Sequence, residues 1–216
     1  RLEDGLFIAE GVKVINEFLN STLELVDLFT TQSFNASKET IITAQELKKI
    51  SALKTPNTAL AIFKIPELTL IDNSGLIVAL DNVRDPGNLG TILRSLAWFG
   101  NFNLLLSPNS VDPFNSKVVR ASMGAIFHVP IELDVPLLSL SERFSHFAYL
   151  DMQGKAISDP DFSEFQCYLF GNEARGVPRD TLVEVNASAF TIAGSGKIDS
   201  LNLASAVNIC AYQLSQ

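Results

Sequence analysis

The 216-residue sequence predicts an α/β protein in which a larger domain, built on a mostly parallel sheet, follows a small front segment. After residue 75, short apolar runs alternate with segments of helical periodicity, as is typical of parallel strands covered on both faces. A polar stretch rich in turn residues precedes these runs. Hydrophobic residues make up 47% of the chain, enough for a sizeable core. The predicted divisions are a front domain at 1–66, a linker at 67–75 and the larger domain at 76–216.

The front segment is predicted to alternate helices and strands. Its expected elements are a helix at 12–19, a strand at 25–30, a helix that begins near 44 and a strand at 59–63. Thr43 and Glu46 form a capping-box pattern at the start of the second helix. We expect Leu47, Ile50 and Leu53 to form the buried stripe of that helix.

The larger domain is predicted to contain six buried strands, at 76–80, 103–106, 125–131, 147–150, 167–170 and 189–192. Helical patterns lie between most of them, and a last helix is expected from Leu201 to Leu214. In open α/β sheets, ligands bind in the loops at the carboxyl ends of the strands. The loops that follow these strands are therefore the first places to search for functional residues.

Composition excludes several classes of protein. No apolar run approaches the roughly 18 residues of a membrane span, so we expect a soluble chain with no membrane partner. The chain begins with neither Met nor a signal-peptide pattern, so we expect it to start inside a longer gene product. Cys167 and Cys210 form no CxxC pattern, and His128 and His146 are the only histidines, which disfavours a metal site or a Ser-His-Asp triad. A reducing, cytoplasmic location is expected.

The net charge of −8 argues at first against nucleic acid as a partner. Residues 67–216 hold nine basic residues against sixteen acidic ones. Five of the nine lie in or beside the functional patterns described next: Arg84, Arg94, Lys117, Arg120 and Arg175. A local basic patch on an acidic protein is compatible with RNA, although scattered solvated charge is the simpler interpretation of charge alone.

The first functional pattern follows the predicted strand at 76–80. A turn-rich loop at 81–87 leads into a helix that we expect Asn88 to cap, and such a helix start offers backbone N–H groups to an anion. Two faces are predicted for this helix, one with Thr91, Arg94, Ser95 and Trp98 and one with Leu89, Ile92, Leu93 and Leu96. Arg94 would then project toward the mouth of the loop, or would be a surface cation on an amphipathic helix.

The second pattern follows the predicted strand at 167–170. Gly171 and Gly176 permit a tight turn and close approach of a ligand, and Pro178 is a suitable first residue for a helix. Glu173 lies between the two glycines. Without further context it would be an ordinary exposed loop acid.

The third pattern is a glycine-containing loop after the strand at 189–192, followed by a helix start. Ser200 and Asn202 lie there, and both residue types are common helix caps. Gly194 and Gly196 do not form a dinucleotide fingerprint, because a third glycine in register and a following βαβ unit are missing. A nucleotide-dependent oxidoreductase is therefore disfavoured.

Taken together, the three patterns resemble the motifs of the SpoU (TrmH-like) family of the SPOUT superfamily, RNA ribose 2′-O-methyltransferases. The matches are Asn88, Gly90 and Arg94 to Asn-x-Gly-x-x-x-Arg, Gly171, Glu173 and Gly176 to Gly-x-Glu-x-x-Gly, and Ser200, Leu201 and Asn202 to Ser-Leu-Asn. The resemblance covers about residues 76–216. It departs at Ile192-Ala193-Gly194, where the family often has Ile-Pro-Met, and at Ala204, where a second Ser is frequent.

The resemblance implies a trefoil knot in the C-terminal part of a SPOUT domain, and an N-terminally truncated L30e-like RNA substrate-binding domain at 1–66. It implies S-adenosyl-L-methionine as cofactor, held by Phe170, Gly171, Asn172, Ile192, Gly194, Gly196 and Leu201. The implied catalytic residues are Arg94, Asn88, Glu173, Ser200 and Asn202, and the expected RNA contacts are Arg84, Lys117, Arg120 and Arg175. The implied partners are RNA, ribosomal in preference to transfer RNA, and a second copy of the chain. No metal is implied.

The implied reaction moves a methyl group from a sulfonium to a ribose 2′-hydroxyl, so the site must hold three atoms in line. By resemblance, Arg94 is the candidate for activating the hydroxyl. Because a guanidinium is not deprotonated in proteins, we favour Arg94 holding the hydroxyl and the adjacent phosphate over a role as base. The altered Ile192-Ala193-Gly194 loop motivates an alternative, an RNA-binding protein without catalysis on the same fold.

Overall fold

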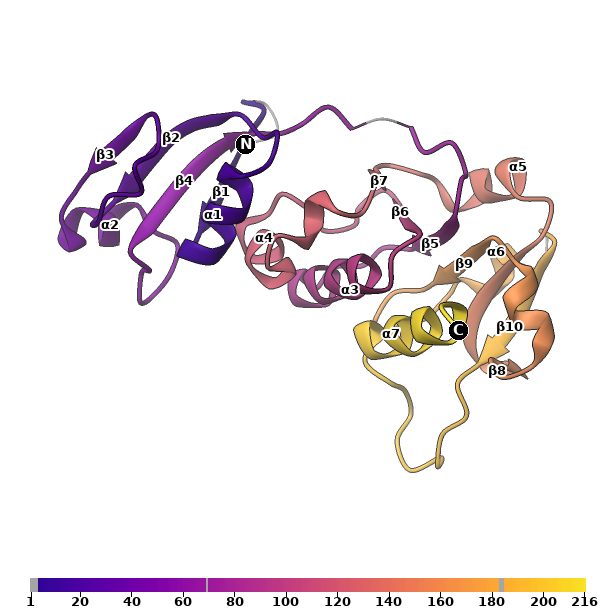
Figure 1. Ribbon diagram of the computed structural model, residues 1–216. Coiled ribbons are helices and arrows are strands. Elements are labelled where there is room, and N and C mark those ends of the chain that lie inside the picture. Colours follow the sequence, from indigo (N-terminus) through magenta and orange to yellow (C-terminus); the bar gives the residue numbers. More distant parts are fainter. Residues whose placement is uncertain (1–3, 69, 183–184) are drawn as a thin grey trace.

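The computed structural model describes residues 4–68, 70–182 and 185–216, and contains two β-sheets (Figure 1). The first sheet has the strand order β1-β4-β2-β3 and the second the order β10-β8-β9-β5-β6-β7. The first three residues of the predicted front domain and residue 69 of the predicted linker lie outside the described residues.

The first sheet carries two helices. Its elements are β1 (Leu6–Glu10), α1 (Val12–Leu19), β2 (Leu25–Thr30), β3 (Glu39–Ile41), α2 (Ala44–Ile50) and β4 (Ala59–Lys64). The predicted helix at 12–19 and the strands at 25–30 and 59–63 are confirmed. The capping box of α2 is present, because the Thr43 side chain accepts from the Glu46 backbone and the Glu46 side chain accepts from the Thr43 backbone.

The second sheet is parallel in every pairing of its six strands. Its strands are β5 (Leu76–Leu80), β6 (Phe102–Leu106), β7 (Ile131–Glu132), β8 (Phe147–Ala156), β9 (Cys167–Phe170) and β10 (Ala187–Thr191). The helices are α3 (Pro86–Phe99), α4 (Ser116–Ser122), α5 (Leu140–Arg143), α6 (Arg179–Leu182) and α7 (Leu203–Leu214), with short 3₁₀ turns η1 (Ala125–Phe127), η2 (Leu137–Ser139) and η3 (Pro160–Glu164). The predicted α/β class with a mostly parallel sheet is confirmed.

Both faces of the second sheet are buried. Successive residues of β5 point to opposite faces, so Val78 packs into one hydrophobic cluster and Ala79 into another. The cluster around Val78 includes buried side chains from α3, α4 and α7, and the cluster around Ala79 includes Leu140 of α5 and Leu182 of α6. This double coverage explains why the strands are continuous apolar runs in the sequence.

Some local predictions were wrong. The predicted strand at 125–131 is instead the turn η1 followed by the two-residue strand β7, because Met123 and Gly124 both take left-handed conformations and turn the chain. In α2, Leu47 is buried but Ile50 is 48% exposed, so the predicted stripe covers less of the helix than expected. The strands β1 and β3 were not predicted, and β3 has only three residues, none of them buried.

The first sheet packs against the segment around α4 and η1 through aromatic rings. Phe7 of β1 lies 5.6 Å from Phe114 and 5.7 Å from Phe127 between ring centroids, and Phe18 of α1 lies 4.9 Å from Phe127. At the edge of this contact Glu17 and His128 are 2.9 Å apart. Each buried Phe side chain contributes about 1.5–3 kcal/mol relative to an exposed one, so the rings stabilise the docked arrangement substantially.

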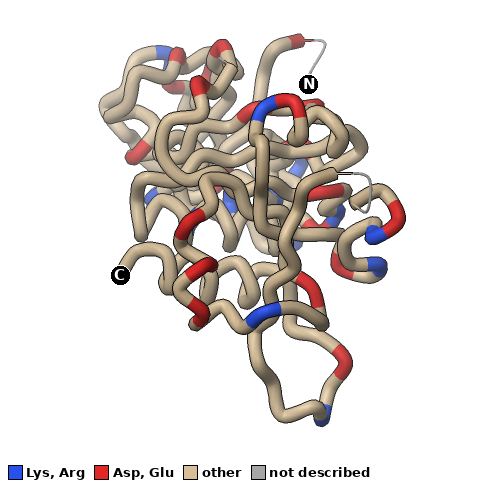
Figure 2. Tube along the Cα trace, turned by 90° about the vertical axis from the view of Figure 1, so that its right-hand side faces the viewer, with Lys and Arg blue, Asp and Glu red and all other residues tan. Residues whose placement is uncertain are grey.

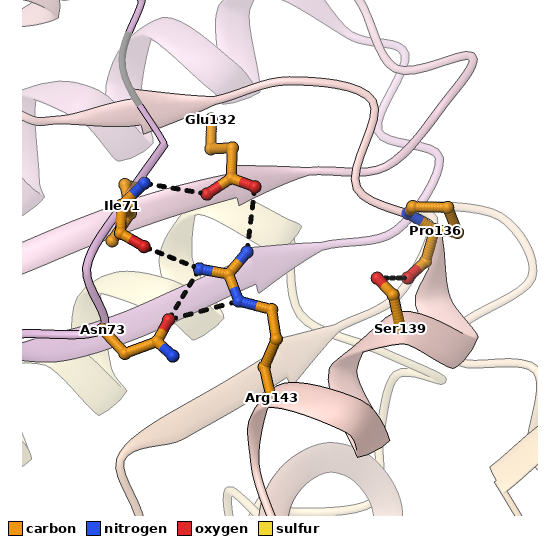
Figure 3. A network of polar contacts seen from close by, with 6 residues as sticks. All are labelled: Ile71, Asn73, Glu132, Pro136, Ser139 and Arg143. Atoms are coloured by element: carbon orange, nitrogen blue, oxygen red, sulfur yellow. Dashed lines mark hydrogen bonds and ion pairs between the residues drawn. The ribbon is translucent and has the colours of Figure 1, made fainter.

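The end of the predicted linker is held by Arg143, as Figure 3 shows. Its guanidinium donates to the Ile71 carbonyl (3.0 Å) and to the Asn73 side chain (2.6 Å), and forms an ion pair with Glu132 (2.9 Å). The other carboxylate oxygen of Glu132 accepts from the Ile71 N–H at 3.0 Å. Both charged side chains are largely buried, since Arg143 is 20% and Glu132 12% exposed. Removal of either one would leave the other as an unpaired buried charge, which is destabilising. Among the described residues no helix is long and apolar enough to cross a membrane.

Candidate active site

The first motif lies in α3, and the loop at 81–85 connects β5 to this helix at the carboxyl edge of the parallel sheet. The helix begins at Pro86, and its N-cap is Asp85, whose carboxylate accepts from the Asn88 N–H at 2.7 Å. The prediction that Asn88 caps this helix is therefore wrong, because Asn88 lies within the first turn. The buried face of α3 is confirmed: Leu89, Ile92, Leu93 and Leu96 are all at most 1% exposed.

Asn88 is free to use its side chain because Asp85 already supplies the cap. An Asp followed by Pro at the first helical position is a pattern that the sequence contains and that would have identified this start. Gly90 faces α4, where a Cβ would come within 2.4 Å of the Ala121 Cβ. The two helices therefore approach closely, and this contact requires glycine.

The second motif forms a tight turn directly after β9. Asn172 and Gly176 exchange backbone hydrogen bonds at 3.2 and 2.8 Å. A Cβ on Gly171 would lie 2.1 Å from the carbonyl carbon of Gly176, so a side chain cannot be accommodated there. The Asn172 side chain accepts from the N–H groups of Ala174 (2.9 Å) and Arg175 (3.2 Å) and donates to the Asn82 carbonyl (2.6 Å). Asn172 was predicted to bind the cofactor, but the structure shows its side chain in bonds within the protein.

The third motif leads from β10 to α7 through an exposed loop. Asn202 is the N-cap of α7, since its side-chain oxygen accepts from the N–H groups of Ala204 (2.9 Å) and Ser205 (3.3 Å). The helix thus begins two residues later than predicted. Capping uses only the oxygen of the Asn202 side chain. Its NH₂ group points to the first motif.

The three motifs meet in one hydrogen-bond network. The Asn202 amide donates to the Asn88 side-chain oxygen at 2.9 Å, and the Asn88 amide donates to Glu173 at 3.2 Å. The Glu173 carboxylate also accepts from the backbone N–H groups of Arg84 (3.4 Å) and Asp85 (3.2 Å). Residues separated by 85 and 114 positions in the sequence are therefore in contact at the carboxyl edge of the sheet.

Arg94 lies beside this network and not within it. Its side chain is exposed on α3, six residues after Asn88, which places the two side chains about 120° apart around the helix. Among the described residues, Arg94 makes no side-chain hydrogen bond and no ion pair. Asn88 and Glu173 hydrogen-bond to each other and not to Arg94. The guanidinium is thus available to a ligand.

The predicted RNA contacts occupy two regions. Arg84 and Arg175 are exposed on the first and second motif loops, and the Arg84 Nε donates to the Asn82 side chain at 3.1 Å. Lys117 and Arg120 are on α4, where Lys117 is exposed and Arg120 is half-buried. The helix α4 packs against both α3 and β1. It therefore lies between the motif loops and the first sheet.

The predicted cofactor residues are divided between a buried and an open part. Phe170 and Gly171 are buried at the end of β9, and Ile192 is half-buried after β10. Gly194, Gly196, Ser200 and Leu201 are exposed on the loop that extends away from the sheet in Figure 1. A Cβ on Gly194 would meet nothing within 4 Å, and in the described residues the backbone N–H groups of 193–201 donate no hydrogen bond. This loop therefore offers free backbone groups and open space.

Among the described residues, a cavity and the two cysteines lie apart from the motifs. A cavity of about 500 Å³ lies between η3 and β10, and it is lined by none of the motif residues. Burial raises the pKa of the Cys167 thiol to about 12, and burial does the same for Cys210. Both thiols are therefore protonated at neutral pH and unsuited to nucleophilic catalysis.

Comparison with known proteins agrees with this geometry. The sequence profile described as the SpoU rRNA Methylase family matches residues 75–212. The mitochondrial rRNA methyltransferase 3 of Mus musculus is 38% identical over 60% of this chain and 34% of that protein. The chain thus spans about a third of the length of this relative.

Two further relatives match nearly the whole chain. The 23S rRNA (guanosine(2553)-2′-O)-methyltransferase RlmP of Bacillus subtilis is 24% identical over 99% of this chain and 90% of that protein. The crystal structure of an AdoMet-bound rRNA methyltransferase from Sinorhizobium meliloti has a TM-score of 0.85 and 28% identity, covering 99% of this chain and 88% of that one. With the family profile matched across all three motifs, this chain belongs to the SpoU rRNA methylase family.

Proposed function

We propose that the protein is an S-adenosylmethionine-dependent methyltransferase that modifies the ribose 2′-hydroxyl of ribosomal RNA. The observation that carries this proposal is the network of Asn88, Glu173 and Asn202, which joins the three family motifs at one edge of the sheet. RlmP, named for 2′-O-methylation of 23S rRNA, and the AdoMet-bound rRNA methyltransferase of Sinorhizobium meliloti support the same activity.

The residues at the ends of β9 and β10 fit this cofactor. Adenosine recognition needs backbone donors and acceptors beside an apolar surface, and the 193–201 loop supplies unbonded N–H groups next to Ile192 and Leu201. The open space at Gly194 leaves room for a ligand, and the turn at Gly171 brings backbone to the same edge. S-Adenosylmethionine would supply the methyl group. The change from Ile-Pro-Met to Ile192-Ala193-Gly194 leaves less side-chain packing for it.

Arg94 is the residue that we place against the RNA. Its unpaired guanidinium has the planar fork that matches a phosphate and a neighbouring hydroxyl. A guanidinium has five N–H donors and no acceptor, so positioning of these groups is a better role than removal of the proton. Asn88, Glu173 and Asn202 then act by holding the motif loops in place beside Arg94 and the ribose. Ser200 lies two residues before Asn202 on the open loop.

The finer architecture belongs to the same proposal. We assign 1–66 to an L30e-like RNA-binding domain, 67–75 to the linker and 76–216 to the SPOUT domain, with a trefoil knot in its C-terminal part. The separate first sheet, and the position of β9 between β8 and β5, are consistent with this assignment. The chain passes from β10 through the open loop before α7 packs on α3, which is the segment a knot would involve.

A homodimer is supported by exposed apolar side chains on two neighbouring helices. On α3, Trp98 is 85% exposed, and on α7 Tyr212 is 56% and Ile209 38% exposed. The ring centroids of Phe99 and Tyr212 are 6.1 Å apart, so Tyr212 of α7 packs against α3 one residue after Trp98. Large apolar patches of this kind mark interaction sites. We propose a second copy of the chain as the partner.

RNA is supported by particular cations more than by overall charge. Figure 2 shows Lys and Arg interspersed with Asp and Glu, without a single extended basic stripe. The exposed cations nearest to the network are Arg84, Arg94 and Arg175. Local contacts of this kind can hold phosphates on an acidic protein, and they predict binding that weakens as salt increases.

The proposed function is tested by mapping 2′-O-methyl positions in total RNA from cells with and without the protein. A ribosomal position that loses its methyl group without the protein supports the proposal, and a lost position in tRNA identifies tRNA as the substrate instead. Calorimetric titration of S-adenosylmethionine provides the second measurement. Absence of cofactor binding together with an unchanged methylation map would favour the non-catalytic RNA-binding alternative.

A further inference from the structure

Asn82 joins three loops at the carboxyl edge of the sheet through its backbone N–H, its backbone carbonyl and its side-chain oxygen. Its N–H donates to the Ser107 hydroxyl at 2.7 Å, after β6, and its carbonyl accepts from the Asn172 side chain at 2.6 Å, after β9. Its side-chain oxygen accepts from the Arg84 Nε at 3.1 Å. Neither the family motifs nor the network of Asn88, Glu173 and Asn202 includes this residue.

The backbone conformation restricts which residues can occupy this position. Asn82 has a φ of 52°, in the left-handed region that non-glycine residues rarely adopt, although Asn tolerates it better than most. Glycine would tolerate the same φ but has no side-chain acceptor for Arg84. Asn therefore combines the required turn with a hydrogen-bonding side chain.

The contact to Asn82 leaves the rest of the Arg84 guanidinium available. Arg84 is exposed, and among the described residues its side chain forms no other hydrogen bond and no ion pair. A bond to Nε orients the guanidinium, while its two terminal nitrogens keep their donors for a phosphate. Orientation before binding reduces the side-chain entropy that is lost when RNA binds.

We infer that Asn82 is a positioning residue for RNA, which holds the Arg84 guanidinium ready for a phosphate of the substrate. The inference rests on the proposed function, because it assumes that the motif loops face RNA. Asn172 and Ser107 support Asn82 from the neighbouring loops, so the orientation of Arg84 depends on the assembled edge of the sheet.

The test compares the wild type with Asn82→Gly, Arg84→Gln and the double variant. The substrate is deproteinised ribosomal RNA from cells that lack the protein, and KM, kcat and the salt dependence of KM are measured. Arg84→Gln should raise KM about tenfold and reduce the salt slope by about one, as expected for loss of one phosphate contact. Asn82→Gly should raise KM by about threefold to fivefold with kcat nearly unchanged, since glycine keeps the turn. The double variant should match Arg84→Gln, because without Arg84 there is nothing for Asn82 to orient.

Asn101→Gly is the matched control. Asn101 also has a left-handed φ, of 59°, and lies exposed outside the motif loops, so this variant should leave KM and kcat unchanged. The inference is overturned if Asn82→Gly equals the wild type, if its effect adds fully to that of Arg84→Gln, or if Asn101→Gly raises KM equally. A wild type that transfers no methyl group overturns the proposed function instead. In that case, filter binding gives the RNA dissociation constants of the wild type, the two single variants and the double variant. The inference is then decided by these constants in place of KM.

Discussion

Gly171 lies against the backbone of Gly176, and no side chain fits between them. We expect Gly171→Ala to lower the free energy of unfolding by about 1–3 kcal/mol, as overpacking does. It should also weaken S-adenosylmethionine binding, because the turn after β9 must move. For the stability measurement Gly194→Ala is the control, since a Cβ there meets nothing within 4 Å of the protein. Urea unfolding and calorimetry measure both effects, and equal stability of the two variants would contradict the prediction.

Arg94 is expected to matter for the reaction and not for the fold. Because its exposed side chain has no partner among the described residues, Arg94→Ala should leave stability and cofactor affinity nearly unchanged. Loss of an oriented guanidinium should lower kcat by about 100-fold or more. Arg94→Lys keeps the positive charge but loses the planar guanidinium that can bind a phosphate with two hydrogen bonds. It should therefore recover only a small part of the activity.

The control for this experiment is Arg179→Ala. Arg179 is an exposed arginine that pairs with Asp151 of β8 and belongs to none of the three motifs, so its loss should leave turnover near normal. Near-normal methyl transfer by Arg94→Ala, measured with labelled cofactor on ribosomal RNA, would exclude the proposed role.

Among the helices with side-chain N-caps, α3 and α2 differ in what the cap supports. Asp85 caps α3 within the first motif, and Thr43 caps α2 in the first sheet. Replacing either by Ala should lower the free energy of unfolding by about 1 kcal/mol. Only Asp85→Ala should also lower methyl transfer, because the Asp85 N–H and the Asn88 side chain are both bonded to Glu173.

Thermal unfolding and initial rates on RNA separate these two effects. If Thr43→Ala reduces turnover as much as Asp85→Ala does at equal stability, then general destabilisation and not loop position explains the loss. The comparison therefore tests whether the start of α3 has a specific role in the site.

At the level of the assembled molecule, Trp98 is the most exposed large hydrophobic side chain of the described residues, at 85%. If α3 and α7 form the interface of a homodimer, Trp98→Glu should weaken dimerisation by about 30-fold or more, as loss of a central Trp at an interface does. Leu138→Glu, at a residue that is 55% exposed on η2, should leave the dimer intact. Sedimentation analysis distinguishes these outcomes, and a wild-type monomer at micromolar concentration would contradict the dimer.

Much of the fold and the identity of the motif residues could be predicted from the sequence. Five of the six predicted strands of the parallel sheet are present, because buried strands are continuous apolar runs and this signal is local. The buried face of α3 and the capping box of α2 were predicted for the same reason. Gly171 and Gly176 were identified because a tight turn requires glycine at specific positions.

Contacts between distant segments became known only from the folded chain. The bonds of Asn88 to Glu173 and Asn202 depend on the order of strands in the sheet, which local periodicity does not encode. The region 125–131 shows the same limit, since its apolar residues pack Phe127 against the first sheet and do not continue a strand. Residue types and spacing thus predict which side chains belong to the motifs. The path of the chain decides which of them meet, because each such contact joins residues that lie far apart in sequence.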